Sequence, residues 1–227
     1  MIIWDLPLRL FHWGLAVAVM GAIISAKTEV LWLHERFGLA VMGLVGFRLC
    51  WGVVGGHFAR FRQFLVWPSA ALAGARQLFH LDNTAKPGHS PLGSYAVMGL
   101  LAVTGFMSIS GSMSNDDVLF EGPLAHLVPD MTNTSSEIHH LGEKALFLML
   151  FLHIAAILIY KFIKRRNLTI VMLKGTDKST PDIPSGTATP NAVTGSISKA
   201  RTIFGVALLL CWIIGAQSLS LLRPSLF

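Results

Sequence analysis

Five apolar segments constrain this chain more than any other feature of its 227 residues. Each is close to the roughly 17–25 residues that cross the hydrocarbon core of a bilayer as a helix. They occupy residues 10–26, 37–54, 92–109, 145–160 and 202–222, with residue 138 as an alternative start for the fourth. Only 13% of the residues are charged, against about 25% in an ordinary soluble domain. The sequence therefore predicts an all-α, multi-pass membrane protein and argues against a soluble enzyme.

Charge is distributed unevenly between the connecting segments. Residues 55–91 and 161–201 are rich in Lys and Arg, whereas residues 110–138 contain no Lys or Arg. That loop holds five acidic residues, Asp116, Asp117, Glu121, Asp130 and Glu137. Because Lys and Arg are enriched in cytoplasmic loops, the asymmetry places the N-terminus in the cytoplasm and the acidic loop outside. The net charge of +6 does not indicate nucleic-acid binding, since no basic block stands apart from the apolar segments.

The chain divides into three expected parts. Residues 1–175 form the main transmembrane domain, and residues 201–227 form an additional transmembrane helix. Between them, residues 176–200 are rich in Ser, Thr, Pro and Gly, so we expect a flexible linker. The stretch PSAALAGARQLF at residues 68–79 predicts a short interfacial helix.

Nine histidines are unusual in so apolar a chain, and four of them are placed at two depths in the predicted spans. His12 and His153 lie toward the cytoplasm, and His34 and His139 lie toward the outside. His139 and His153 share one helix face about 21 Å apart at 1.5 Å per residue, whereas His140 points roughly 140° away from His153. Two imidazoles from facing helices can fill both axial positions of a haem iron.

The pattern therefore predicts two stacked haem centres, one held by His12 with His153 and the other by His34 with His139. Four glycines near these positions would leave room for a porphyrin: Gly14, Gly21, Gly38 and Gly142. Separate packing histidines are the simpler alternative. A zinc site is disfavoured because no Cys or carboxylate joins either pair with suitable spacing. A histidine-based proton or metal-ion transporter is disfavoured because such proteins usually carry acidic residues in their spans, and the cores of the apolar segments here contain none. The chain has no CxxCH motif, which excludes covalently attached c-type haem.

The sequence also resembles the bacterial cytochrome b561 and Ni,Fe-hydrogenase b-type cytochrome superfamily. The matching stretches are WDLPLRLFHW, LHERFG…FRLCWGVVG, ARFRQF, PGHSPLG, GPLAHLV, EIHH…FLHIAAILIY and RRNLTIVMLKG. They follow one another in the family's order over about residues 4–175. The resemblance implies a four-helix transmembrane bundle that binds two non-covalent b-type haems and exchanges electrons with membrane quinone. It places the haem ligands on His12, His34, His139 and His153.

Two features depart from the family pattern. His140 stands where the family commonly has Glu, and compact members end after four spans, so the fifth span is an addition. We expect a di-haem cytochrome of the bacterial inner membrane, an electron-transfer subunit of a quinone-linked oxidoreductase in a respiratory chain. Its external partner would be a c-type cytochrome or a hydrogenase-like subunit.

The alternative is a self-contained superoxide:quinone oxidoreductase. Such an enzyme needs a cationic outer surface to attract its anionic substrate, whereas the outer loop here is acidic.

For several other polar residues the sequence offers both a structural and a functional role. Arg9 and Arg48, near the cytoplasmic ends of their spans, could pair with haem propionates or quinone, or could set topology. His89 lies between Pro87 and Pro91, which favours a role in capping and turn formation over a role in binding quinone or conducting protons. The remaining loop histidines, which we expect to be solvated, are His57, His80 and His126.

Overall fold

The computed structural model describes residues 3–64, 67, 69, 91–115, 120–176 and 197–223. Within these residues the regular structure is helical, apart from an isolated bridge between Asn115 and Glu121. The long helices are α1 (Leu6–Lys27), α2 (Leu31–Val54), α5 (Pro91–Ser112), α6 (Thr132–Phe162) and α8 (Lys199–Ser218). The short ones are η1 (His57–Ala59), α3 (Phe61–Phe64), η2 (Ala125–Leu127), η3 (Pro129–Met131), α7 (Leu168–Lys174) and η4 (Leu219–Leu222).

Among the described residues, five helices are long and apolar enough to cross a membrane, which confirms the predicted all-helical architecture. All five begin or end within a few residues of the expected segments. Helix α6 begins at Thr132, before either expected start at residue 145 or 138, because its first turns carry polar residues that hydropathy does not register. The interfacial helix expected over residues 68–79 and the linker over residues 176–200 fall largely outside the described residues.

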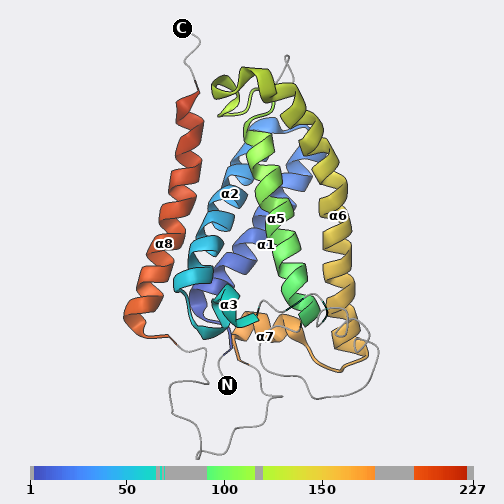
Figure 1. Cartoon of the computed structure of the whole chain (residues 1–227), viewed down its shortest axis with the longest axis vertical. Coiled ribbons are helices and arrows are strands. Elements are labelled where there is room, and N and C mark those ends of the chain that lie inside the picture. The colour runs from blue at the N-terminus through green and yellow to red at the C-terminus, as the bar shows by residue number, and fades with distance from the viewer. Residues whose placement is uncertain are drawn as a thin grey trace, which may run out of the picture.

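Helix α2 is the central helix of the bundle. It packs against α1, α5 and α8, while α6 packs along α5, as the arrangement in Figure 1 shows. Two helix pairs, α1–α2 and α5–α6, are thus joined through the α2–α5 contact. Close backbone approaches between α1 and α6 are few among the described residues, so the bundle is open along the side where these two helices face each other.

A buried polar cluster fixes the end of the bundle at which α1 begins, which we call the N-terminal end. Asp5 caps α1 by accepting a hydrogen bond from the backbone N–H of Leu8 at 2.9 Å. Its carboxylate also accepts from Trp51 Nε1 at 3.2 Å and from the N–H of Gly56 at 3.3 Å. Burial raises the pKa of Asp5, and these hydrogen bonds and the nearby Arg48 oppose the rise. The cluster therefore ties α1 to both α2 and the chain that follows it.

The opposite end of the bundle, which we call the loop end, carries the connection between α5 and α6. This connection folds back on α5, since the N–H groups of Gly122 and Leu124 donate to the carbonyls of Ser114 and Ser112, both at 2.8 Å. The turn between α1 and α2 and the 3₁₀ helix η4 lie at the same end (Figure 1). Segments that are far apart in the sequence therefore lie together at the loop end.

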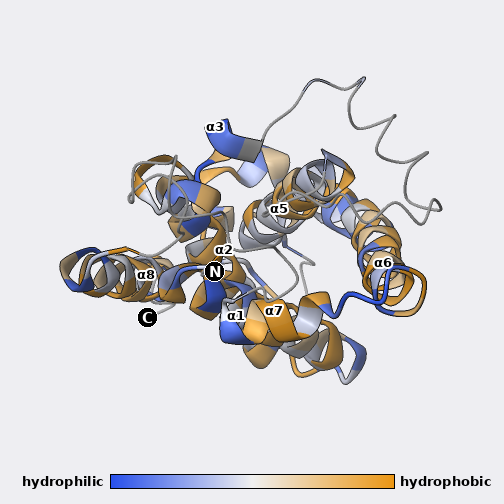
Figure 2. Ribbon diagram, turned by 90° about the horizontal axis from the view of Figure 1, so that it is seen from below, coloured by the Kyte–Doolittle hydropathy of each residue, from blue (hydrophilic) through white to orange (hydrophobic). Residues whose placement is uncertain are grey.

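The long helices consist largely of hydrophobic residues (Figure 2), and many of their large apolar side chains are exposed. Helix α6 is the clearest case, with Phe151 68% and Ile154 55% exposed. A soluble protein does not leave so much contiguous apolar surface uncovered. Lipid would cover this surface in a membrane, and there the helices satisfy their own backbone hydrogen bonds.

Candidate functional site: two histidine pairs between helices

The structure brings His12 of α1 and His153 of α6 together across the open side of the bundle. Their ring centroids are 6.5 Å apart and the ring planes are inclined by 49°. The Nδ1 atom of His12 is buried and has no hydrogen-bond partner among the described residues. A buried polar atom without a hydrogen bond costs free energy. Metal binding by the other ring nitrogen, Nε2, would offset that cost.

His34 of α2 and His139 of α6 form a second pair nearer the loop end, with ring centroids 6.0 Å apart and nearly perpendicular ring planes. His34 Nδ1 lies 2.8 Å from the carbonyl oxygen of Ala22. His139 Nδ1 lies 2.9 Å from the carbonyl oxygen of Met107. Because a carbonyl can only accept, each Nδ1 must carry the proton, which leaves the lone pair on each Nε2. This is how metal-binding histidines are usually held.

Both separations fit a metal bound between two imidazoles. A metal–imidazole bond is about 2 Å long and the ring centroid lies about 1 Å further, so two axial rings have centroids about 6 Å apart. Within the described residues no group of three or more His, Cys, Asp or Glu side chains converges. Each pair therefore offers two protein ligands, which suits a metal whose other ligands come from a macrocycle.

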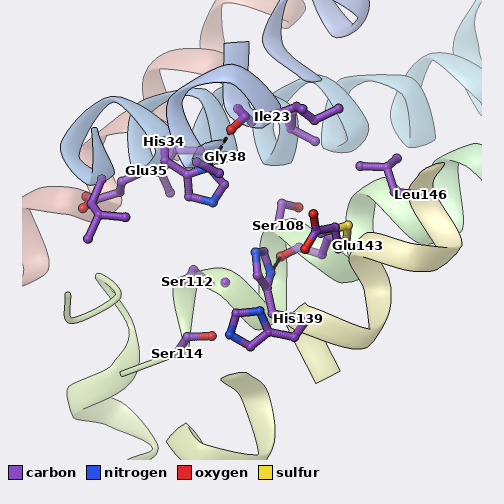
Figure 3. Close-up of a pocket in the computed structure, with 18 of the residues that line it drawn as sticks. Ile23, His34, Glu35, Gly38, Ser108, Ser112, Ser114, His139, Glu143 and Leu146 are labelled. Carbon is purple, nitrogen blue, oxygen red and sulfur yellow. Dashed lines mark hydrogen bonds between the residues drawn. The ribbon is translucent and has the colours of Figure 1, made fainter. Parts of the chain in front are cut away.

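A cavity of about 470 Å³ surrounds the His34–His139 pair. This volume lies within the range of about 300–1,000 Å³ found for small-molecule and cofactor sites. Its lining includes apolar residues such as Ile23 and Leu146 and polar residues such as Ser108 and Ser114. Figure 3 shows His34 and His139 entering this space from two different helices. A ligand with an apolar body and a few polar substituents fits such a lining.

The four glycines expected to make room for a porphyrin differ in what they do. A Cβ at Gly38 would meet nothing within 4 Å, and Gly38 lines the cavity. At Gly21, however, a Cβ would lie 2.5 Å from the Phe37 ring, and at Gly142 it would lie 2.9 Å from Met107. These two glycines accommodate side chains of neighbouring helices, whereas a Cβ at Gly14 would make an ordinary contact with Leu44 at 3.5 Å. The expectation is therefore supported for Gly38 and wrong for Gly21 and Gly142.

Two ion pairs flank the cavity. Lys27 at the end of α1 lies 2.6 Å from Glu143 of α6, so this pair bridges the open side of the bundle. Arg223 lies 2.7 Å from Glu35, the residue after His34. Arg223 was not predictable as a site residue, because nothing in the sequence places the segment after α8 beside the start of α2. Lys27, Glu35 and Glu143 all line the cavity.

The structure gives both span-end arginines structural contacts. Arg9 Nη1 donates to the carbonyl oxygen of Leu173 at 2.8 Å and so fastens α7 to α1. Arg48 is only 1% exposed, and its guanidinium lies 4.4 Å from the centroid of the Phe61 ring, near Asp5. These contacts favour the structural interpretation of both arginines over a propionate or quinone role.

The remaining histidines are scattered. His140 lines the same cavity as His139, with ring centroids 6.4 Å apart, but its own ring is exposed. His57 is exposed in η1, as expected, whereas His126 in η2 is half-buried. His80 and His89 lie outside the described residues, as do Asp116 and Asp117 of the acidic loop.

Comparison with known proteins adds one match. A family model described as prokaryotic cytochrome b561 matches residues 3–175. The matched region contains all four paired histidines and ends before α8. No curated protein and no solved structure matches the chain.

Proposed function

The chain belongs to the prokaryotic cytochrome b561 family, whose members are membrane b-type cytochromes of electron transfer, and from that premise we propose that it binds two haems. This family membership confirms the resemblance carried by the sequence motifs. In the proposal, His12 with His153 and His34 with His139 are the axial ligands of two non-covalent b-type haems. Residues 1–175 are the haem-binding domain, residues 176–200 a linker, and residues 201–227 an additional spanning helix.

One observation carries the proposal: each histidine pair joins α6 to a different helix at a different depth. His139 and His153 are 14 residues apart in α6, about 21 Å along the helix axis. That distance covers most of the roughly 30 Å hydrocarbon core. Haem supplies reversible one-electron chemistry at its iron. The protein holds the ligating nitrogens at the two sites, keeps water away from most of the electron path between them and sets the charge around each haem.

The proposed redox partners are membrane quinone and a protein at the outer face. The uneven distribution of Lys and Arg supports an N-terminus in the cytoplasm of a bacterial inner membrane. In that orientation the His34–His139 pair lies near the outer face, beside the acidic loop. A c-type cytochrome or a hydrogenase-like subunit with a basic docking surface would meet complementary charge there.

The charges at the loop end favour this role over superoxide oxidation. An enzyme for superoxide needs free positive charge around its entrance. Here Lys27 is paired with Glu143 and Arg223 with Glu35, so carboxylates offset the charge of these two cations.

A reduced-minus-oxidised visible spectrum of the purified protein, combined with a haem assay after acid extraction, tests the proposal. We expect the spectrum of a b-type cytochrome and two extractable haems per chain, both re-oxidised by a soluble quinone analogue. A preparation with one haem per chain would contradict the two-centre arrangement. Haem that stays attached to the protein after extraction would contradict non-covalent binding.

A further inference from the structure

Helix α8 lies outside the family match and yet is closely docked on the haem-binding part of the chain. It packs along α2 and touches α1. At Gly43 of α2, a Cβ would lie 2.6 Å from the carbonyl oxygen of Trp212, so the two backbones are in contact. At Gly46 a Cβ would lie 2.4 Å from the Trp212 ring. Small residues allow such close approach between membrane helices, and the position of α8 is therefore fixed along α2.

The end of α8 makes four polar contacts with the residues that follow His34. Gln217 Nε2 donates to the carbonyl oxygen of Arg36 at 2.8 Å, and Arg36 Nη1 donates to Ser220 Oγ at 2.8 Å and to Gln217 Oε1 at 3.3 Å. Arg223 Nη2 lies 2.7 Å from Glu35 Oε2. The same nitrogen donates to the backbone carbonyl of Glu121 at 2.6 Å. Arg223, which directly follows η4, thus joins three segments: the end of α8 with η4, the start of α2 and the acidic loop.

Glu35 is the residue in this arrangement that bears on the redox site. It follows His34 in the chain and lines the same cavity, and its side chain is only 10% exposed. A carboxylate so far removed from water is costly unless it is paired. Arg223 is the cation that pairs with it, and α8 delivers Arg223 to this position.

We infer that Arg223 is a positioning residue that sets the reduction potential of the haem at His34 and His139, an inference that rests on the proposed function. Paired with Arg223, Glu35 adds little net charge beside the haem. Without Arg223, the Glu35 carboxylate would favour the ferric state, which carries one more positive charge than the ferrous state. The added helix α8 thereby becomes part of the outer redox centre.

Spectroelectrochemical titration of the full-length haem-loaded protein tests this inference. In Arg223→Gln we expect the reduction equilibrium of one haem to become roughly tenfold less favourable, about 59 mV for one electron, while the other haem is unchanged. Glu35→Gln should raise the same potential, and the double variant should return close to the wild-type value. Arg223→Lys should restore most of the shift. Arg201→Gln, at the far end of α8, is the matched control and should leave both potentials unchanged.

A second measurement requires no haem. Carbodiimide labelling of accessible carboxylates, read by mass spectrometry, should find Glu35 protected in the wild type and labelled in Arg223→Gln. If Arg223→Gln fails to fold, Glu35→Gln decides the sign, because a purely structural role for the pair would not raise the potential.

The outcomes distinguish this inference from the proposed function. Two unchanged haem potentials in both single variants would overturn the inference and leave the di-haem proposal standing. Potentials lowered equally in both single variants would also overturn it, because general loosening and not charge would then be the cause. A wild-type protein without haem would overturn both.

Discussion

At the scale of single residues, the His34–His139 pair is held more completely than the His12–His153 pair. Carbonyl acceptors fix the Nδ1–H tautomer of both His34 and His139. His12 has a buried Nδ1 without such a partner. Since a second hydrogen bond orients a ligand and raises its basicity, the two centres should differ in affinity for haem. We expect the haem at His34 and His139 to be retained longer when haem is extracted by apomyoglobin, and equal loss of both haems would contradict this.

The choice between His139 and His140 as a ligand can be tested directly. His139 faces His34 with ring centroids 6.0 Å apart, whereas the ring of His140 is exposed. We expect His139→Ala to lose one of two haems and His140→Ala to keep both, as measured by haem content and by the reduced spectrum. His153→Ala should lose the other haem. Loss of a haem in His140→Ala with full retention in His139→Ala would reverse the assignment.

The two histidine pairs were predictable from the sequence, because helical geometry places His139 and His153 on one face and the topology puts His34 and His12 at matching depths. The contacts of Arg223 and Asp5 were not predictable, because each depends on residues far away in the sequence. Asp5 meets Trp51 and Gly56 only after α1 and α2 have packed. The glycines were misread for the same reason, since the sequence does not show which side chain faces each of them.

Asp5 offers a prediction about stability. Replacing it by Ala removes the cap of α1 and leaves the buried Trp51 indole without its acceptor. We expect Asp5→Ala to lower the free energy of unfolding by about 2–4 kcal/mol, as a lost cap plus an unsatisfied buried donor. Asp5→Asn keeps an acceptor oxygen and should cost less, although it removes the charge near Arg48. Thermal unfolding in detergent compares the two variants, and equal losses would show that the hydrogen bonds to Asp5 contribute little.

At the scale of elements, α6 and α8 depart most from what hydropathy predicts. Apolar windows located the lipid-embedded part of α6 but not its first turns, where TNTSSEIHHLGEK is polar at most positions. That polar part carries His139 and Glu143, so the functional end of the helix is also the end that hydropathy misses. For α8 the sequence predicted a span but gave no information about which helix it packs against.

The α2–α8 contact can be tested with two matched glycine substitutions. A Cβ at Gly43 would clash with the backbone of α8, whereas a Cβ at Gly215 of α8 would meet nothing within 4 Å. We expect Gly43→Ala to destabilise the protein by about 1–3 kcal/mol through overpacking. Gly215→Ala should be neutral or stabilising by up to about 1 kcal/mol, because Ala is the better helix former. Similar thermal unfolding of the two variants would contradict the close docking of α8.

At the scale of the whole molecule, orientation in the membrane follows from charge. The described residues of the basic segments, 55–64 and 161–176, lie at the N-terminal end of the bundle, and those of the acidic loop, 120–131, lie at the other. We therefore expect five spans with the N-terminus in the cytoplasm and the C-terminus outside. In a background with Cys50 and Cys211 replaced by Ser, Asn133→Cys, at an exposed position at the loop end, should react with an impermeant maleimide added outside intact cells and Ser198→Cys should not. The reverse pattern would invert the molecule and the depths of both haems.

The acidic loop gives the last prediction, which concerns the encounter with a redox partner. Residues 110–138 contain five carboxylates and no Lys or Arg. Arg223 donates to the backbone carbonyl of Glu121, but its charge is paired with Glu35. The loop should therefore keep a negative field beside the His34–His139 pair. Such fields raise the rate of encounter with cationic partners by roughly 10- to 1,000-fold and weaken as salt rises.

Acidic residues contribute little to topology, so neutralising them should leave the fold intact. We expect Asp116→Asn, Asp117→Asn and Glu121→Gln together to slow electron exchange with a basic c-type cytochrome at low ionic strength while the haem spectra stay unchanged. At high salt the variant and the wild type should converge. Equal rates at both salt concentrations would mean that the loop is acidic without guiding a partner.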